Sequence, residues 1–100
     1  MEDITVEDLK KRLDNNEALN LVDVREDWEN EEFNIGGKLI PVNQLPGRLD
    51  ELNGLADSEV IVYCRSGNRS GSAKIFLEKN GFTKVRNLVG GMMEWQRKIS

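Results

Sequence analysis

The amino-acid sequence predicts an α/β fold, with a central, mainly parallel sheet of about five short strands and helices on both faces. The first observation is the nearly continuous apolar run Glu59-Val60-Ile61-Val62-Tyr63, which is typical of a strand buried on both faces. The second is that strand-like and helix-like segments alternate along the chain, as in proteins built from βα units. A length of 100 residues with 38% apolar side chains suits one core, so we expect a single domain over residues 1–100.

The first half of the chain predicts two strands and three helical segments. Thr5 is placed to cap a helix, because Asp8 follows three residues later as in a capping-box variant. Gly36-Gly37 ends the second helical segment. The predicted elements are a helix from residue 5 to residue 15, a strand over 19–24, a helix over 27–32, a strand over 38–42 and a helix over 45–52.

The second half has a clearer pattern. A polar loop over residues 64–69 follows the buried strand, and a helix begins near Ser70 and ends before the stop signal Gly81. A last strand covers residues 85–88. Gly90-Gly91 then turns the chain into a final helix, in which Trp95 has the spacing of a core residue. Ligands of parallel α/β sheets bind beyond the carboxyl ends of the strands, which is where residues 64–69 fall.

Charge and hydropathy exclude several classes of partner. The chain has 14 basic and 18 acidic residues and a net charge of −4, with no basic stripe, so we expect no nucleic-acid binding. No apolar run approaches the roughly 18–20 residues of a membrane-spanning helix, so we expect no membrane partner. Met1-Glu2-Asp3 lacks the features of a signal peptide, which makes the cytoplasm the expected location.

The residue types that are absent restrict the chemistry further. The chain has no histidine, which removes the usual general base and histidine metal sites. It has one cysteine, Cys64, which excludes an intrachain disulfide, a CxxC redox pair and a thiolate zinc cluster. We therefore expect no metal and no organic cofactor, and a chemistry carried by carboxylates, arginines, backbone amides or this thiol.

The segment from Cys64 to Ser70 carries the clearest chemical signal. Cys64 leaves a buried strand, and the chain enters a helix about five residues later through small and turn-forming residues. Inward amide groups and the positive end of that helix favour a negative charge, so the thiol pKa should fall below about 8.5. Arg65 and Arg69 add positive charge. On position alone Cys64 is equally consistent with a small buried apolar residue, and the loop with a phosphate cradle, although the lysine of a P-loop is missing.

Four segments of the chain carry recognisable motifs in a fixed order, and together they cover nearly its whole length. They are residues 21–26, residues 31–37 with Ile40-Pro41, residues 62–70, and residues 81–95 with Gly90-Gly91 and Trp95. In this order they resemble the rhodanese family of sulfurtransferases in its single-domain form. The resemblance implies an α/β fold around a parallel sheet, and a cysteine that cycles between thiolate and persulfide.

The resemblance implies that Cys64 is the nucleophile and accepts a sulfane sulfur from a small anionic donor such as thiosulfate. An external thiol or a protein acceptor then takes the sulfur, and we expect a monomer. Arg69 is expected to be the electrostatic partner of the persulfide or of departing sulfite, and Arg65 to recruit the donor from the rim. The pocket is implied to be lined by the loop residues Arg65, Ser66, Gly67, Asn68, Arg69 and Ser70.

Several alternatives remain open on the sequence. Four residues separate Cys64 from Arg69, whereas cysteine phosphatases use five, so the spacing favours sulfur transfer over phosphatase or arsenate reductase activity. A binding or redox-sensing module that keeps the fold is the other alternative. Asp23 and Arg25 are candidates to support the loop from behind, although a pairing of Arg25 with Glu32 is favoured. Asn34 stands where many relatives have histidine, which predicts a changed hydrogen bond.

Overall fold

A computed structural model describes residues 1–99 of the chain, folded around one parallel sheet. The strands β1 (Asn20–Asp23), β2 (Lys38–Leu39), β3 (Glu59–Tyr63) and β4 (Lys84–Asn87) lie in the order β2-β1-β3-β4, and each neighbouring pair is parallel. The α/β prediction is confirmed. The sheet has four strands where the sequence predicted about five, and Ile4 adds one parallel bridge to Leu88 beyond β4.

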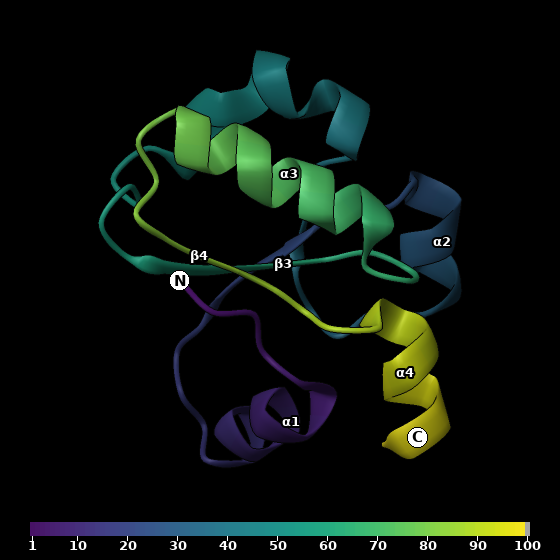
Figure 1. Cartoon of the computed structure of the whole chain (residues 1–100). Coiled ribbons are helices and arrows are strands. Elements are labelled where there is room, and N and C mark those ends of the chain that lie inside the picture. The colour runs from purple at the N-terminus through teal and green to yellow at the C-terminus, as the bar shows by residue number, and fades with distance from the viewer. Residues whose placement is uncertain (100) are drawn as a thin grey trace.

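Helices cover both faces of the sheet (Figure 1). On one face lie α3 (Asn68–Lys79) and a 3-10 helix, η1 (Val42–Leu52); on the other lie α1 (Val6–Asp14) and α4 (Gly91–Lys98). The short helix α2 (Asp27–Glu32) lies near the carboxyl end of the sheet, on the same side of Figure 1 as the start of α3. The whole arrangement brings α2, α3 and α4 toward one end of β3.

The central strand β3 shows why the sheet has two cores. Successive side chains of a strand point to opposite faces. Val60 and Val62 pack with α3 and η1, whereas Ile61 and Tyr63 pack with α1 and α4. These four residues are fully buried, so the apolar run of the sequence corresponds to a strand covered on both sides, as predicted. Trp95, expected in the core, is buried in the second cluster.

Several predicted boundaries shift for local reasons. The segment predicted as a helix over residues 45–52 is the 3-10 helix η1, with Pro46 inside it and a break in the helical angles at Arg48. Proline has no N–H to donate, which weakens a regular α-helix there. The second strand ends at Leu39 because Pro41 begins the turn into η1. Helix α3 begins at Asn68, two residues before the predicted start.

The capping prediction for α1 is confirmed: the Asp8 amide donates to the Thr5 hydroxyl over 3.1 Å. Across residues 1–99, each helix is too short or too polar to cross a membrane.

Candidate active site

Cys64 lies directly after the carboxyl end of β3, and its side chain is enclosed by the segment that leads into α3. The residue is fully buried, with 0% of its surface exposed. The neighbouring strand β1 ends at Asp23, level with Tyr63. Cys64 therefore lies just beyond the carboxyl ends of the strands, as the sequence predicted. The loop around the sulfur therefore determines its chemistry.

Four hydrogen-bond donors of the loop surround the Cys64 sulfur. The amide of Gly67 donates to Sγ over 3.1 Å, the amide of Ser70 over 3.4 Å and the Ser70 hydroxyl over 3.2 Å. The amide of Ser66 also contributes to stabilising the charged sulfur. Gly67 has φ +103°, a left-handed angle that glycine adopts without strain, and it turns the chain directly into the first turn of α3.

These donors set the charge state of the sulfur. Burial raises the pKa of the Cys64 thiol, but hydrogen bonds from the hydroxyl and amide of Ser70 and the amides of Gly67 and Ser66 outweigh it, so the pKa lies below its usual value. The positive end of α3 acts in the same direction. A larger share of the sulfur is then thiolate near neutral pH, which is the nucleophilic form.

Helix α4 holds the other side of the same loop. The amides of Met92 and Met93 in its first turn donate to the carbonyl oxygens of Cys64 and Arg65, each over 2.9 Å. A Cβ at Gly91 would collide with both carbonyls, lying 2.6 Å from that of Arg65, and the φ of Gly91 is +56°. The close contact between α4 and the loop therefore requires glycine at this position.

Within residues 1–99, Arg69 makes no hydrogen bond to the sulfur. Its guanidinium donates through both terminal nitrogens to the Glu29 carboxylate, over 2.7 and 2.9 Å. This Arg69 bond holds the pKa of Glu29 down to about 2, although burial opposes it. Glu29 raises the pKa of Arg69 in turn, and the charge of Cys64 adds a smaller contribution of the same sign. Arg69 thus interacts with the sulfur through the field of its charge.

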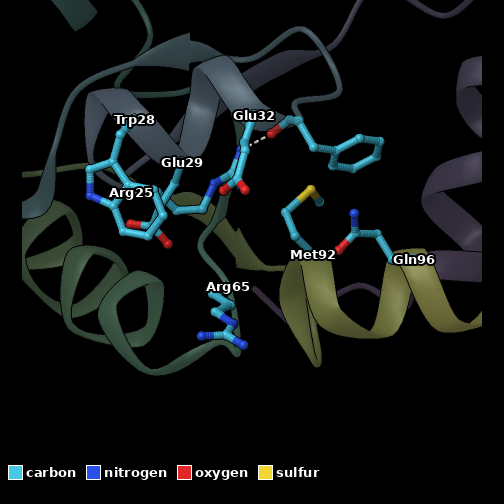
Figure 2. A pocket seen from close by; sticks show the side chains of 8 residues that line it. Arg25, Trp28, Glu29, Glu32, Arg65, Met92 and Gln96 are labelled. Carbon is cyan, nitrogen blue, oxygen red and sulfur yellow. Dashed lines mark hydrogen bonds between the residues drawn. The ribbon is translucent and has the colours of Figure 1, made fainter.

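Arg65 is exposed and lies at the edge of a pocket of about 350 Å³ between α2 and α4. In Figure 2 its guanidinium points away from the other lining side chains, among them Glu32, Met92 and Gln96. Trp28, on the opposite wall, is 64% exposed. The sequence analysis expects Arg65 at the rim of the loop, and in the structure its side chain extends from the loop toward solvent.

Asp23 and Arg25 form a buried ion pair behind the loop. Arg25 donates to Asp23 through Nε over 3.0 Å and Nη2 over 2.8 Å, and Nη2 also reaches the carbonyl of Phe33 over 2.6 Å. The favoured pairing of Arg25 with Glu32 is therefore wrong: Asp23 is two residues away and equally buried, whereas Glu32 is exposed. Over residues 1–99, neither side chain hydrogen-bonds to the Cys64–Ser70 loop, so any support reaches it through α2.

Two polar residues at the site, Glu29 and Asn87, were not predicted from the sequence. Glu29 lies among other acidic residues of α2, a pattern typical of a solvated helix face, yet it is only 7% exposed and binds Arg69. Asn87, the last residue of β4, accepts from the Ser70 hydroxyl over 2.6 Å and donates to the Gly67 carbonyl over 3.0 Å. Its place at the end of a parallel strand was the signal available, because such ends share one edge of the sheet.

The remaining predicted residues, Ser66, Asn68 and Asn34, lie at the surface or in a turn, and among residues 1–99 they do not bind the sulfur through their side chains. Ser66 and Asn68 are exposed, and within the described chain the Asn68 side chain has no hydrogen bond to the sulfur. Asn34 makes local bonds only, donating to the Asn30 carbonyl and accepting from the Gly36 amide, each over 2.9 Å. Asn34, where the sequence analysis expects a changed hydrogen bond, is thus part of a turn in this chain.

Comparison with known proteins identifies the same architecture. The family model described as the rhodanese-like domain matches residues 5–98. A sulfurtransferase of Allochromatium vinosum is 38% identical over 96 residues, covering 95% of this chain and 88% of that protein. A Bacillus subtilis protein, YrkF, named as a candidate sulfur carrier, is 40% identical over 97 residues, or 96% of this chain. The present chain spans 51% of YrkF, about half its length.

The solved structures agree. The crystal structure of a rhodanese-like domain protein from Staphylococcus aureus superposes with a TM-score of 0.86 at 34% identity, covering 95% of this chain and 91% of that one.

Proposed function

Since the chain belongs to the rhodanese-like domain family, as its sulfurtransferase relatives do, we propose that it transfers a sulfane sulfur through a persulfide on Cys64. The observation that carries this proposal is the group of loop donors directed at a single buried sulfur. They favour the thiolate without a histidine base, and the sequence contains no histidine. We further propose that the protein acts as a monomer in the reducing cytoplasm, where Cys64 stays a free thiol.

The loading step uses a small anionic donor, of which thiosulfate is the simplest. The Cys64 thiolate attacks the outer sulfur of thiosulfate, and a new sulfur–sulfur bond forms. The bond between that outer sulfur and the sulfonate breaks, and its electron pair leaves with sulfite. The charge of the thiolate moves to the outer sulfur of the persulfide, so charge and atoms balance.

The loop would serve both states of the sulfur. The Gly67 and Ser70 amides point at Sγ in the empty protein. The neighbouring loop residues Ser66 and Asn68 are exposed, and the outer sulfur of a persulfide would extend about 2 Å from Sγ. Because Cys64 is fully buried, the loop has to open by a small movement before a donor reaches Sγ. Exposed Arg65 would attract the donor, and Arg69 would oppose the charge of departing sulfite.

The unloading step needs an external acceptor. Cys64 is the single cysteine in the chain, so the persulfide has no internal thiol to form a disulfide with. A nucleophile such as cyanide, a small thiol or a protein acceptor attacks the outer sulfur, and the electron pair of the sulfur–sulfur bond returns to Sγ as thiolate. The cycle is then a double displacement.

Intact-mass measurement tests the proposal directly. The reduced protein is incubated with thiosulfate, measured, and measured again after cyanide is added. The proposal expects a gain of one sulfur atom that cyanide removes, and no gain in Cys64→Ser, which keeps a similar size but forms no persulfide. No gain from thiosulfate, polysulfide or a persulfidated small thiol, with Cys64 reduced and alkylatable, would overturn it. Rapid peroxide oxidation in that case would favour the redox-sensing alternative.

A further inference from the structure

The Ser70 hydroxyl lies between two hydrogen-bond acceptors. Its oxygen is 3.2 Å from Cys64 Sγ and 2.6 Å from Asn87 Oδ1. Ser70 is fully buried, so water does not reach the hydroxyl to supply a further partner. A hydroxyl carries one hydrogen, and it therefore donates to only one of the two acceptors at a time.

The Asn87 side chain is held in the orientation that creates this competition. Its Nδ2 donates to the Gly67 carbonyl over 3.0 Å, which leaves Oδ1 facing Ser70. The reversed amide would place two oxygens, Oδ1 and the Gly67 carbonyl, against each other. The backbone of Asn87 is fixed as well, because its amide donates to the Asp3 carboxylate over 3.0 Å. Oδ1 is thus a fixed acceptor, and the hydroxyl is the group that turns.

The charge on Sγ determines which acceptor is preferred. A thiolate is a strong acceptor, since hydrogen bonds to ionised groups are roughly twice as strong as neutral ones. A thiol, or the inner sulfur of a persulfide, carries no charge and accepts weakly. The hydroxyl should therefore turn to Sγ in the empty thiolate and to Asn87 once sulfur is loaded and the charge has moved to the outer atom.

We propose that Asn87 is a positioning residue for sulfur loading: its side-chain carbonyl takes the Ser70 hydroxyl whenever Sγ becomes uncharged, and so favours the loaded protein over the empty thiolate. This inference rests on the proposed sulfur transfer. The bond changes of loading are those given above, and Asn87 gains or loses one hydrogen bond without exchanging a proton. Removing the acceptor should leave the hydroxyl on Sγ, which stabilises the thiolate against both uncharged forms.

Two measurable consequences follow for Asn87→Ala. The loading equilibrium at a fixed ratio of thiosulfate to sulfite should fall by about threefold to tenfold, the range of one net hydrogen bond. The thiol pKa of Cys64 should fall by about half a unit to one unit, because the same bond is lost from the thiol form. A variant that merely loosened the loop would weaken the amide bonds to the thiolate and raise the pKa.

The test is a double-mutant cycle with four proteins: the parent, Asn87→Ala, Ser70→Ala and the double variant. The pH dependence of Cys64 alkylation gives the thiol pKa, and intact mass at equilibrium gives the loaded fraction. When Ser70 is present, Asn87→Ala should lower both the thiol pKa and the loaded fraction. In the Ser70→Ala background it should change neither the acid dissociation constant of the thiol nor the loading equilibrium by more than about twofold. Equal effects in the two backgrounds, or a raised pKa with Ser70 present, would overturn the proposal.

Charged neighbours are common to all four proteins and so cancel in the cycle. They are the Arg69–Glu29 pair from α3 and α2, exposed Arg65 in the loop, and Asp3 behind β4. Asn20→Ala is the matched control, because Asn20 also donates its side-chain amide to a backbone carbonyl, that of Glu59 at the opposite end of the sheet. It should leave pKa and loading unchanged.

The cycle also separates this proposal from the proposed function. If none of the proteins takes up sulfur, sulfur transfer from thiosulfate fails. The alkylation profiles still decide whether Asn87 acts on the sulfur through Ser70: a pKa shift that requires Ser70 supports that coupling, and its absence overturns it.

Discussion

The two ends of strand β3 each hold an ionisable side chain whose pKa is lowered by hydrogen bonds, and the donors of those bonds differ. At the amino end, the Glu59 carboxylate accepts from Arg12 over 2.6 and 2.8 Å and from Arg86 over 3.0 Å. At the carboxyl end, the Cys64 sulfur accepts from backbone amides and a hydroxyl, all from uncharged groups. Arg69, the guanidinium next along this loop, is bound to Glu29 instead.

The difference corresponds to what each charge does. Paired guanidinium groups neutralise Glu59 and join α1, β3 and β4, which serves stability. A thiolate paired in the same way would have its lone pairs occupied by a cation and would be a weaker nucleophile. Uncharged dipoles lower the thiol pKa while leaving the sulfur a net negative charge. A structural charge is thus paired with cations, and a reactive one is surrounded by dipoles.

The largest expected effect comes from removing the sulfur at the carboxyl end of β3. Cys64→Ala should abolish sulfur uptake, because no other thiol is available, while the fold remains. Intact mass after thiosulfate measures the uptake, and circular dichroism checks the fold. Sulfur uptake retained in this variant would show that Cys64 is not the sulfur carrier. The carboxyl end of β3 would then not be the reactive end.

The next largest effect should follow from Gly91→Ala, which disturbs the loop without touching a donor to the sulfur. The new Cβ would collide with the carbonyls of Cys64 and Arg65, and the left-handed φ of +56° disfavours alanine. We expect a loss of about 2–4 kcal/mol in the free energy of unfolding and at least a tenfold lower loading rate. Urea denaturation and timed intact mass measure the two quantities.

Gly47→Ala is its control, because a Cβ there has nothing within 4 Å and the backbone angle is ordinary. Equal stability of Gly91→Ala and Gly47→Ala would contradict the close packing of α4 on the loop.

At the amino end the expected effect is on stability alone. Glu59→Gln should cost about 1–2 kcal/mol at pH 7 and leave the alkylation rate of Cys64 unchanged. Hydrogen bonds from Arg12 and Arg86 hold the pKa of Glu59 below its usual value although burial opposes them. Because the pKa is lower in the folded state, ionised Glu59 stabilises the fold fully at pH values above its unfolded-state pKa near 4.5. This stabilisation is lost as the pH falls through the pKa of the folded state.

The stability difference between parent and Glu59→Gln should therefore be full at pH 7 and shrink below about pH 4, as urea denaturation at several pH values would measure. A difference that persisted unchanged at pH 3 would contradict an ionic origin.

The smallest expected effect concerns Arg69, whose guanidinium is paired with Glu29. Glu29→Gln removes the carboxylate charge that neutralises Arg69, so the net positive charge near the loop increases. The concentration of thiosulfate for half-maximal loading rate should fall by about twofold to threefold at low salt, and the difference should disappear at high salt. An increase instead would mean that Glu29 holds Arg69 where the donor needs it. Arg69→Ala is the companion variant and should raise the same concentration.

The elements that local pattern determines were predictable from the sequence. The run at β3, the alternation of strands and helices, and the place of Cys64 at a strand end follow from periodicity and from the topology of parallel sheets. The partners of buried charges did not follow. Glu29 and Arg69 are 40 residues apart, and their contact depends on how α2 is placed against α3. Arg25 took Asp23 instead of Glu32 because burial, which the local pattern does not give, differs between these acids.

Helix α4 has a consequence for joining this domain to others. Its first turn binds the carbonyls of the active loop, and its eight residues extend about 12 Å from there. A sulfur acceptor fused after Lys98 through a short flexible linker would be tethered close to Cys64, at an effective concentration in the millimolar range. Transfer within such a fusion would be intramolecular, and its rate would not change on dilution. Linker length would then set the rate of delivery.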